Sequence, residues 1–195
     1  MSRLVVAVGD SITYAEHLPR EQAWTTLLSD RLGCPVLNKG VCADTTRLGL
    51  ERFPRDVQEP LAAHDGPATV VIQFGANDAN RWVTDRGHPR VSRPAFIANL
   101  SEMVDRARVF GADDIVLCTI ARHERGARLA EDCERYSVMI RALGRALGLD
   151  VFDVEALGPL SYLDGLHLDA LANARYAEGL GGVIERAWWR EAVAA

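Results

Sequence analysis

The run Thr69-Val70-Val71-Ile72-Gln73-Phe74 is followed directly by Gly75-Ala76-Asn77-Asp78. The run is apolar almost throughout and is rich in β-branched residues, which predicts a strand that is buried on both faces. Strands of this kind are typical of a parallel sheet with helices on either side, because the crossover helices cover both faces. The glycine that follows marks the point where the strand ends and a loop begins.

The same alternation extends in both directions from this strand. Short apolar runs predict four further strands, at residues 4–8, 35–37, 115–119 and 150–154. Segments with helical spacing lie between them, at residues 21–32, 45–57 (interrupted at Pro54), 92–111, 128–147 and 169–189. This pattern predicts an α/β fold: a doubly wound, five-stranded parallel sheet in three layers, flavodoxin-like, with residues 1–195 as a single domain.

Composition narrows the classes of partner. The chain has 27 acidic and 22 basic residues, and this net charge of −5 argues against nucleic acid, which needs a basic surface. No apolar run approaches the length that a membrane span requires, and the N-terminus lacks a signal-peptide core, so we expect a cytoplasmic protein that does not bind membranes. Four scattered cysteines favour neither a disulfide framework nor a metal site. The expected partner is a small molecule, and the oligomeric state stays open.

Polar side chains follow the predicted strands. Ser11 comes after the first strand and Asn77 after the third, while Asp164 and His167 directly precede the last helix. Each of these alone is typical of a turn or a helix cap. Because the carboxyl ends of parallel strands meet at one edge, however, the fold should bring all four together. A nucleophile, an amide donor, a carboxylate and a base are the parts that acyl transfer requires.

Other α/β chemistries lack their motifs. No G-x-G-x-x-G follows the first strand, and neither a phosphate-binding G-x-x-x-x-G-K-[ST] nor a G-x-S-x-G elbow occurs. A phospho-acceptor receiver domain would need a lysine after the fifth strand, and the one lysine of the chain is Lys39. The sequence therefore does not favour nucleotide binding, the usual α/β-hydrolase arrangement or a receiver domain.

Three short motifs, taken together, resemble those of the SGNH, or GDSL-type, hydrolase superfamily. They are Gly9-Asp10-Ser11, Gly75-Ala76-Asn77-Asp78 and Asp164-Gly165-Leu166-His167, in the family's order and spacing along the whole chain. The resemblance implies hydrolysis of an ester or thioester through an acyl-enzyme, without a metal or organic cofactor. It implies Ser11 as nucleophile, His167 as base and Asp164 as the carboxylate that orients the base.

The oxyanion hole is implied by the same resemblance. Its donors would be the N–H groups of Ser11 and Ala43 and the side-chain amide of Asn77. The family usually has glycine where this chain has Ala43, when the second loop is aligned on Asn38 and Asp44-Thr45. Alanine keeps the N–H donor at negative φ but disfavours positive φ. Gly40 is the alternative donor.

The substrate is indicated by charge in two loops. Arginines follow Asn77, with Trp82 among them, and arginines follow the fourth strand; these are Arg81, Arg86, Arg90, Arg93, Arg122, Arg125 and Arg128. Guanidinium groups favour carboxylate or phosphate, and tryptophan stacks on sugars. We therefore expect a small polar acylated metabolite, such as an acetylated sugar or an anionic conjugate. The expected substrate contacts are Asp10, Gly40, Arg81, Trp82 and Arg122.

The charged loops also have a plain interpretation, which is solvated surface in an arginine-rich chain. Two alternative functions remain open as well. One is an acyltransferase that uses the same serine, histidine and aspartate, and the other is a non-catalytic, flavodoxin-like binding protein. A reactive-serine probe separates catalysis from binding, and product analysis with an added acceptor separates hydrolysis from transfer.

Overall fold

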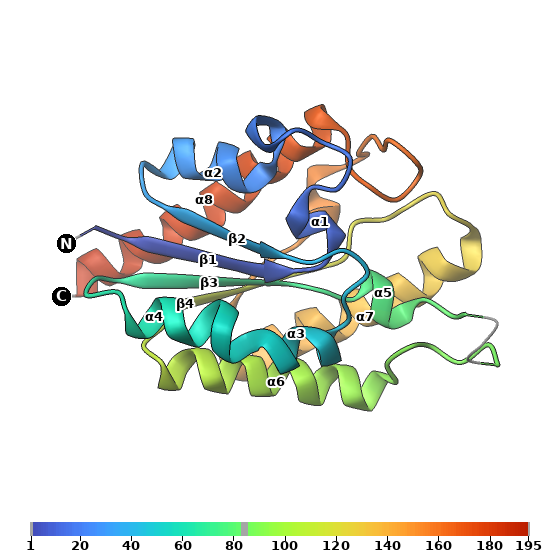
Figure 1. Cartoon of the computed structure of the whole chain (residues 1–195), viewed down its shortest axis with the longest axis horizontal. Coiled ribbons are helices and arrows are strands. Elements are labelled where there is room, and N and C mark those ends of the chain that lie inside the picture. The colour runs from blue at the N-terminus through green and yellow to red at the C-terminus, as the bar shows by residue number, and fades with distance from the viewer. Residues whose placement is uncertain (1, 83–85, 195) are drawn as a thin grey trace.

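The computed structural model describes residues 2–82 and 86–194, and its centre is a parallel sheet (Figure 1). The strand order is β2-β1-β3-β4-β5. The strands are β1 (Leu4–Gly9), β2 (Val36–Gly40), β3 (Ala68–Gln73), β4 (Asp114–Cys118) and β5 (Asp150–Phe152). All four neighbouring pairs are parallel. The predicted five-stranded, doubly wound sheet is confirmed.

Long helices cover both faces of the sheet. On one face lie α2 (Trp24–Leu32) and α8 (Ala170–Ala194), and on the other lie α3 (Thr46–Phe53), α6 (Arg93–Val109) and α7 (Ala127–Leu147) (Figure 1). Short elements join them: α1 (Ser11–Tyr14), α4 (Glu59–Ala62), α5 (Ala76–Ala79), 3-10 turns at Arg20–Gln22 and Val154–Leu157, and a π-helical turn at Pro54–Gln58. Among the described residues, no helix combines the length and apolar character needed to cross a membrane.

The strands feed two hydrophobic cores because successive side chains point to opposite faces. In β1, Val6 and Val8 pack with Phe53 and Phe96 under α3 and α6. Val5 and Ala7 instead join the core beneath α2 and α8, where the side chains of Trp24 and Tyr176 are buried. All six residues of β1 and of β3 are buried, so these central strands are apolar rather than alternating.

The helix after β2 departs from its prediction. An interruption was expected at Pro54, but the backbone stays helical there and widens into the π turn Pro54–Gln58 before α4. Pro54 has φ −55° and ψ −54°, values that the pyrrolidine ring accepts. A wider turn suits proline because proline has no N–H for the α-helical hydrogen bond.

The topology sets the place of the site. With the order 2-1-3-4-5, the connections leave β1 and β3 in opposite directions, and a crevice forms beyond their carboxyl ends. α1 follows β1 and α5 follows β3, so both short helices lie at that edge, away from the chain termini (Figure 1). Ser11 begins α1 and Asn77 lies in α5.

Candidate active site

The turn that presents Ser11 requires glycine at the end of β1. A Cβ added to Gly9 would lie 2.1 Å from Thr13 Oγ1 and 2.4 Å from the Gln73 carbonyl oxygen. Asp10 then caps α1, because its carboxylate accepts the Ile12 N–H at 3.0 Å. Ser11 is the first residue of α1, so its side chain leaves the sheet edge at a fixed angle.

Ser11, His167 and Asp164 form a hydrogen-bonded chain. Ser11 Oγ lies 3.0 Å from His167 Nε2, and His167 Nδ1 lies 2.9 Å from Asp164 Oδ2. The other oxygen, Oδ1, accepts the N–H groups of Leu166 (3.0 Å) and His167 (2.8 Å). Desolvation raises the pKa of Asp164, but these hydrogen bonds outweigh it and hold the pKa well below its usual range. The ionised carboxylate can thus keep the imidazole proton on Nδ1 and leave Nε2 to face the serine.

Arg125 is a further partner of Asp164. Its guanidinium binds the Asp164 carboxylate and donates to the Asp164 carbonyl oxygen at 3.3 Å. The loop after β4 is held against this segment because the Glu124 N–H donates to the Gly165 carbonyl at 2.7 Å. The sequence predicted that Arg125 helps to bind the substrate. In the structure its guanidinium instead binds the carboxylate of Asp164.

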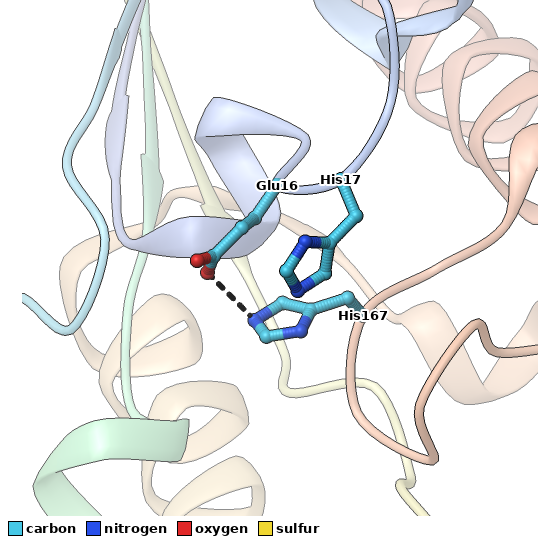
Figure 2. Close-up of side chains that lie close together, drawn as sticks. All are labelled: Glu16, His17 and His167. Carbon is cyan, nitrogen blue, oxygen red and sulfur yellow. Dashed lines mark ion pairs between the residues drawn. The ribbon is translucent and has the colours of Figure 1, made fainter.

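Two residues that the sequence analysis missed also meet His167. Glu16 Oε2 lies 3.0 Å from Nε2, the nitrogen that also faces Ser11, and the His17 ring lies 5.0 Å from the His167 ring at 81° (Figure 2). Ala15 has φ +63°, and this left-handed residue turns the chain back over the site after α1. The sequence signal that could have identified them is the ionisable pair Glu16-His17, five and six residues after Ser11.

The candidate oxyanion donors differ in their availability. The Gly40 N–H already donates to Asn38 Oδ1 at 2.9 Å, and an added Cβ at Gly40 would lie 2.1 Å from the Tyr14 nitrogen. Gly40 is therefore packed against α1, which does not support it as a donor or as a substrate contact. Within residues 2–82 and 86–194, neither the Ala43 N–H nor the Asn77 side-chain amide has a hydrogen-bond partner. Both are free to meet a ligand.

A partly buried arginine holds the loops around the site. Arg52 donates to the carbonyl oxygens of Gly9 and Lys39, both at 2.8 Å, and to the carboxylates of Asp44 and Asp56, both at 2.6 Å. It therefore joins the ends of β1 and β2 to α3. No sequence motif marks Arg52, because its two carbonyl and two carboxylate partners are brought together only by the fold.

Asp78 joins the loops after β2 and β3. Its carboxylate accepts the Thr46 N–H at 3.0 Å and the Thr46 hydroxyl at 2.5 Å. Asn99 of α6 donates to the same hydroxyl at 2.9 Å. The two loops that carry Ala43 and Asn77 are thereby fixed relative to each other.

The four other expected substrate contacts differ in burial and in bonding partners. Asp10, one of the expected contacts, is fully buried. Arg81 is bound by Asp132 at 2.8 Å and by the Gly87 carbonyl, so its guanidinium serves the loop structure. Trp82 and Arg122 are both exposed.

Trp82 is exposed and pairs with the partly buried Arg90 beside the candidate oxyanion loop, residues 41–45 between β2 and α3. The Arg90 guanidinium lies 4.2 Å from the centre of the Trp82 ring and donates to the Ala43 carbonyl oxygen at 2.9 Å. Of the arginines that follow Asn77, Arg90 is the one with a contact to the oxyanion loop itself.

Asp10 makes stability depend on pH in an unusual direction. Burial, with added repulsion from Asp78 and Asp44, raises its pKa from 3.8 to about 7. The folded state therefore binds this proton more tightly than the unfolded state, and the free energy of unfolding should decrease as pH rises between about 4 and about 7. Asp10→Asn keeps an acceptor for the Ile12 N–H and should reduce this decrease.

Urea denaturation from about pH 5 to about pH 8 measures the effect. Asp78, whose pKa is raised to about 6 chiefly by burial, remains in the variant, so the slope should shrink rather than vanish. The exposed Asp65→Asn is the matched control and should follow the wild type. An unchanged slope in Asp10→Asn would contradict the buried-carboxyl account.

The backbone at Ala43 carries strain. Its φ is +64°, the left-handed conformation that alanine disfavours by about 1–2 kcal/mol. Ala43→Gly should therefore match or exceed wild-type stability and turnover, whereas Ala43→Val should lower both, because a β-branched residue fits this conformation worse. Thermal unfolding and ester turnover of the two variants check this. Equal stability and equal turnover of Ala43→Gly and Ala43→Val would show that the left-handed backbone at position 43 does not matter.

Comparisons with known proteins identify the family of this chain. Residues 7–175 match the model of the GDSL-like Lipase/Acylhydrolase family. Esterase TesA of Pseudomonas aeruginosa is 30% identical over 188 residues, which cover 92% of this chain and 86% of that protein. An arylesterase of Vibrio mimicus is 32% identical over 121 residues, covering 60% of this chain and 54% of that protein.

Solved structures show the same fold. The crystal structure of TesA superimposes with a TM-score of 0.73 and 26% identity, covering 95% of this chain and 99% of that one. Est24, a carbohydrate acetylesterase from Sinorhizobium meliloti, superimposes with a TM-score of 0.77 at 20% identity and the same coverage. The family model spans most of the sequence, and the motifs after the strands occur in the order typical of the family. The chain therefore belongs to the GDSL-like lipase/acylhydrolase family and is a serine hydrolase that acts on ester bonds.

Proposed function

We propose that this protein hydrolyses an ester of a small polar acylated metabolite through an acyl-enzyme on Ser11. The observation that carries the proposal is the hydrogen-bonded chain from Ser11 through His167 to Asp164, with links of 3.0 Å and 2.9 Å. These distances are those at which a serine transfers its proton to a histidine base that a carboxylate orients.

The reaction has two halves. Ser11 Oγ attacks the acyl carbon while His167 Nε2 takes the hydroxyl proton, and His167 then gives that proton to the leaving alkoxide as the acyl-enzyme forms. Water attacks the acyl-enzyme next, and His167 takes its proton. The tetrahedral intermediate collapses, releases the carboxylic acid and returns the proton to Ser11.

The developing oxyanion would meet the N–H groups of Ser11 and Ala43 and the amide of Asn77. A single donor of this kind contributes about 3 kcal/mol to the transition state. Support for these roles comes from the free Ala43 N–H and Asn77 amide, and from the Asp78 contacts that hold their two loops together.

Asn77→Ala should lower kcat by about 10²- to 10³-fold with a much smaller change in KM, because the amide meets charge that exists only in the transition state. Asn80, three residues on, bonds its neighbour Arg81, and Asn80→Ala is the matched control. Steady-state kinetics on para-nitrophenyl acetate separate the two. An effect on KM alone would move Asn77 from the oxyanion hole to ground-state binding.

The polar substrate is inferred from the pocket beside the oxyanion loop. This pocket, of about 220 Å³, is lined by Thr45, Arg47, Leu48, Trp82, Arg90 and Val91. It offers two guanidinium groups and an indole ring, and Arg90 connects it to the oxyanion loop through the Ala43 carbonyl. Guanidinium groups bind anionic groups by paired hydrogen bonds, and an indole face suits a sugar ring.

Two measurements test the function. A fluorophosphonate probe should label Ser11, and the label should be absent after His167→Ala, because an unactivated serine reacts slowly. Anionic and neutral esters of one acyl group are then compared at low and high salt. We expect the anionic ester to be favoured, salt to weaken the preference, and Arg90→Gln to remove it.

Arg108→Gln, at the far end of α6, is the control for that comparison and should keep the preference. Equal rates for both esters at all salt concentrations would overturn the substrate class while leaving the hydrolase assignment intact. Transfer of the acyl group to an added alcohol, in place of acid release, would favour the acyltransferase alternative.

A further inference from the structure

We propose that Glu16, His17 and His167 form a binding site for a divalent transition-metal ion such as Zn²⁺, and that the bound ion switches the enzyme off. The inference rests on the proposed function, since His167 is the proposed base. It concerns an inhibitory ion and not a cofactor.

The donor atoms are close enough for one ion. One ligand atom from each of the three side chains lies within 4.8 Å of the others, and Glu16 Oε2 is 3.0 Å from His167 Nε2 (Figure 2). Bonds of about 2.0–2.1 Å in a tetrahedral zinc site separate neighbouring ligand atoms by about 3.3 Å. Two imidazoles and a carboxylate select a transition metal over Mg²⁺ or Ca²⁺, which prefer oxygen alone.

The hydrogen bond from His167 to Asp164 already prepares the site. Metal-binding histidines usually donate their second ring N–H to a carboxylate, which fixes the tautomer and raises the basicity of the free nitrogen. His167 Nδ1 makes such a contact with Asp164 at 2.9 Å, so Nε2 is the ring nitrogen that faces Glu16 and Ser11. The same geometry that suits a general base therefore suits a zinc ligand.

The segment that carries Glu16 and His17 is held in an uncommon conformation. Ala15 (φ +63°) and His17 (φ +71°) are both left-handed and flank Glu16. Hydrogen bonds from Glu16 N–H to the Ser11 carbonyl and from Leu18 N–H to the Ala15 carbonyl, both 3.1 Å, maintain the turn. Such strain persists where the surrounding structure imposes it and is concentrated at functional sites.

The cluster is also reachable. The side chain of His17 is 53% exposed and that of Glu16 is 31% exposed, whereas that of His167 is 10% exposed. An ion can enter past His17 and then meet His167. Once bound, it occupies the electron pair on Nε2 that must accept the Ser11 proton, so turnover stops for as long as the ion stays.

Direct binding and inhibition are measured separately. Zn²⁺ binding is followed by competition with a chromogenic chelator, on the wild type, Ser11→Ala, Glu16→Gln, His17→Asn and His64→Asn. Asparagine is chosen at position 17 because it tolerates a left-handed backbone. His64 contacts the Ser2 carbonyl, at the edge of the sheet where β1 begins, and serves as the control histidine. Hydrolysis of para-nitrophenyl acetate by the wild type, Glu16→Gln, His17→Asn and His64→Asn is titrated with Zn²⁺, and EDTA is then added to each.

We expect one tightly bound Zn²⁺ in the wild type, Ser11→Ala and His64→Asn. Binding should weaken at least about tenfold in Glu16→Gln and His17→Asn, because the loss of a mere hydrogen-bond partner of a metal ligand already costs about 10- to 100-fold in affinity. The Zn²⁺ concentration that halves the remaining activity of each variant should rise in parallel, and EDTA should restore wild-type turnover. Millimolar Mg²⁺ should leave turnover unchanged.

The outcomes separate this proposal from the proposed function. Equal Zn²⁺ affinity in wild type, Glu16→Gln and His17→Asn would overturn the metal site, as would full turnover of the zinc-loaded wild type. An apo wild type without esterase activity, but with the expected pattern of Zn²⁺ binding across the variants including Ser11→Ala, would instead overturn the hydrolytic function and uphold the site.

Discussion

Ser11→Ala should lower kcat on para-nitrophenyl acetate by about 10⁶-fold, the loss found when the nucleophile of a serine triad is removed. No neighbouring group can replace it: Ser11 Oγ is the hydroxyl that faces His167 Nε2, and removing it ends covalent catalysis. Steady-state kinetics at high enzyme concentration measure the residual rate, and fluorophosphonate labelling should disappear in parallel.

The fold should survive this substitution. The Ser11 side chain makes its hydrogen bond to His167 alone among the described residues, and alanine is readily accommodated in the first turn of α1. Ser92→Ala is the informative control, because Ser92 caps α6 by accepting the Ala95 N–H. It should cost about 1 kcal/mol of stability and leave turnover intact. If the kcat of Ser11→Ala lies within tenfold of the wild-type kcat, Ser11 is not the nucleophile.

Asp164→Asn should lower kcat by about 10³- to 10⁴-fold while the site keeps its shape. The carboxylate oxygen now accepts the proton on His167 Nδ1; an amide nitrogen at that position would donate instead and would favour the tautomer with its proton on Nε2. That tautomer cannot take the proton of Ser11. Kinetics and a crystal structure of the variant measure rate and geometry together.

The matched control is Asp169→Asn. Asp169 accepts the Ala172 N–H at 2.8 Å at the start of α8, five residues after Asp164, and its substitution should affect stability alone. Asp164→Asn should also lose the stability that the lowered pKa of Asp164 supplies. That contribution is present above the pKa of the unfolded chain and is lost as pH falls through the folded pKa. A rate loss as small as that of Asp169→Asn would leave Asp164 without an orienting role.

The central strands could be predicted because their signal is local. The run from Thr69 to Phe74 is apolar on both faces, and a strand with that pattern is stable only between two layers of helices. By contrast, α1 and α5 have four residues each, too few for a helical period, so they were not predicted. Proline at position 54 was expected to break a helix, yet packing keeps the chain helical as a π turn.

The strand-end motifs determined which residues meet at the site. The sequence alone placed Ser11, Asn77, Asp164 and His167 at one edge, because the carboxyl ends of parallel strands share that edge and the hydrophobic pattern fixes the strands. The distances from Ser11 to His167 and from His167 to Asp164 follow that expectation. Ser11 and Asn77 could be found because each follows the end of a predicted strand by three residues, and Asp164 and His167 because they lie shortly before the last predicted helix.

Only the tertiary structure decided which charges serve the site and which serve the fold. Arg81, Arg90 and Arg125 look alike in sequence, but they bind Asp132, the Ala43 carbonyl and Asp164, respectively. Arg52 acts on the backbone of loops that are distant along the chain, and Glu16 reaches His167 through a left-handed turn. Long side chains and positive φ angles are set by contacts across the fold, whereas a buried strand is set by its own residues.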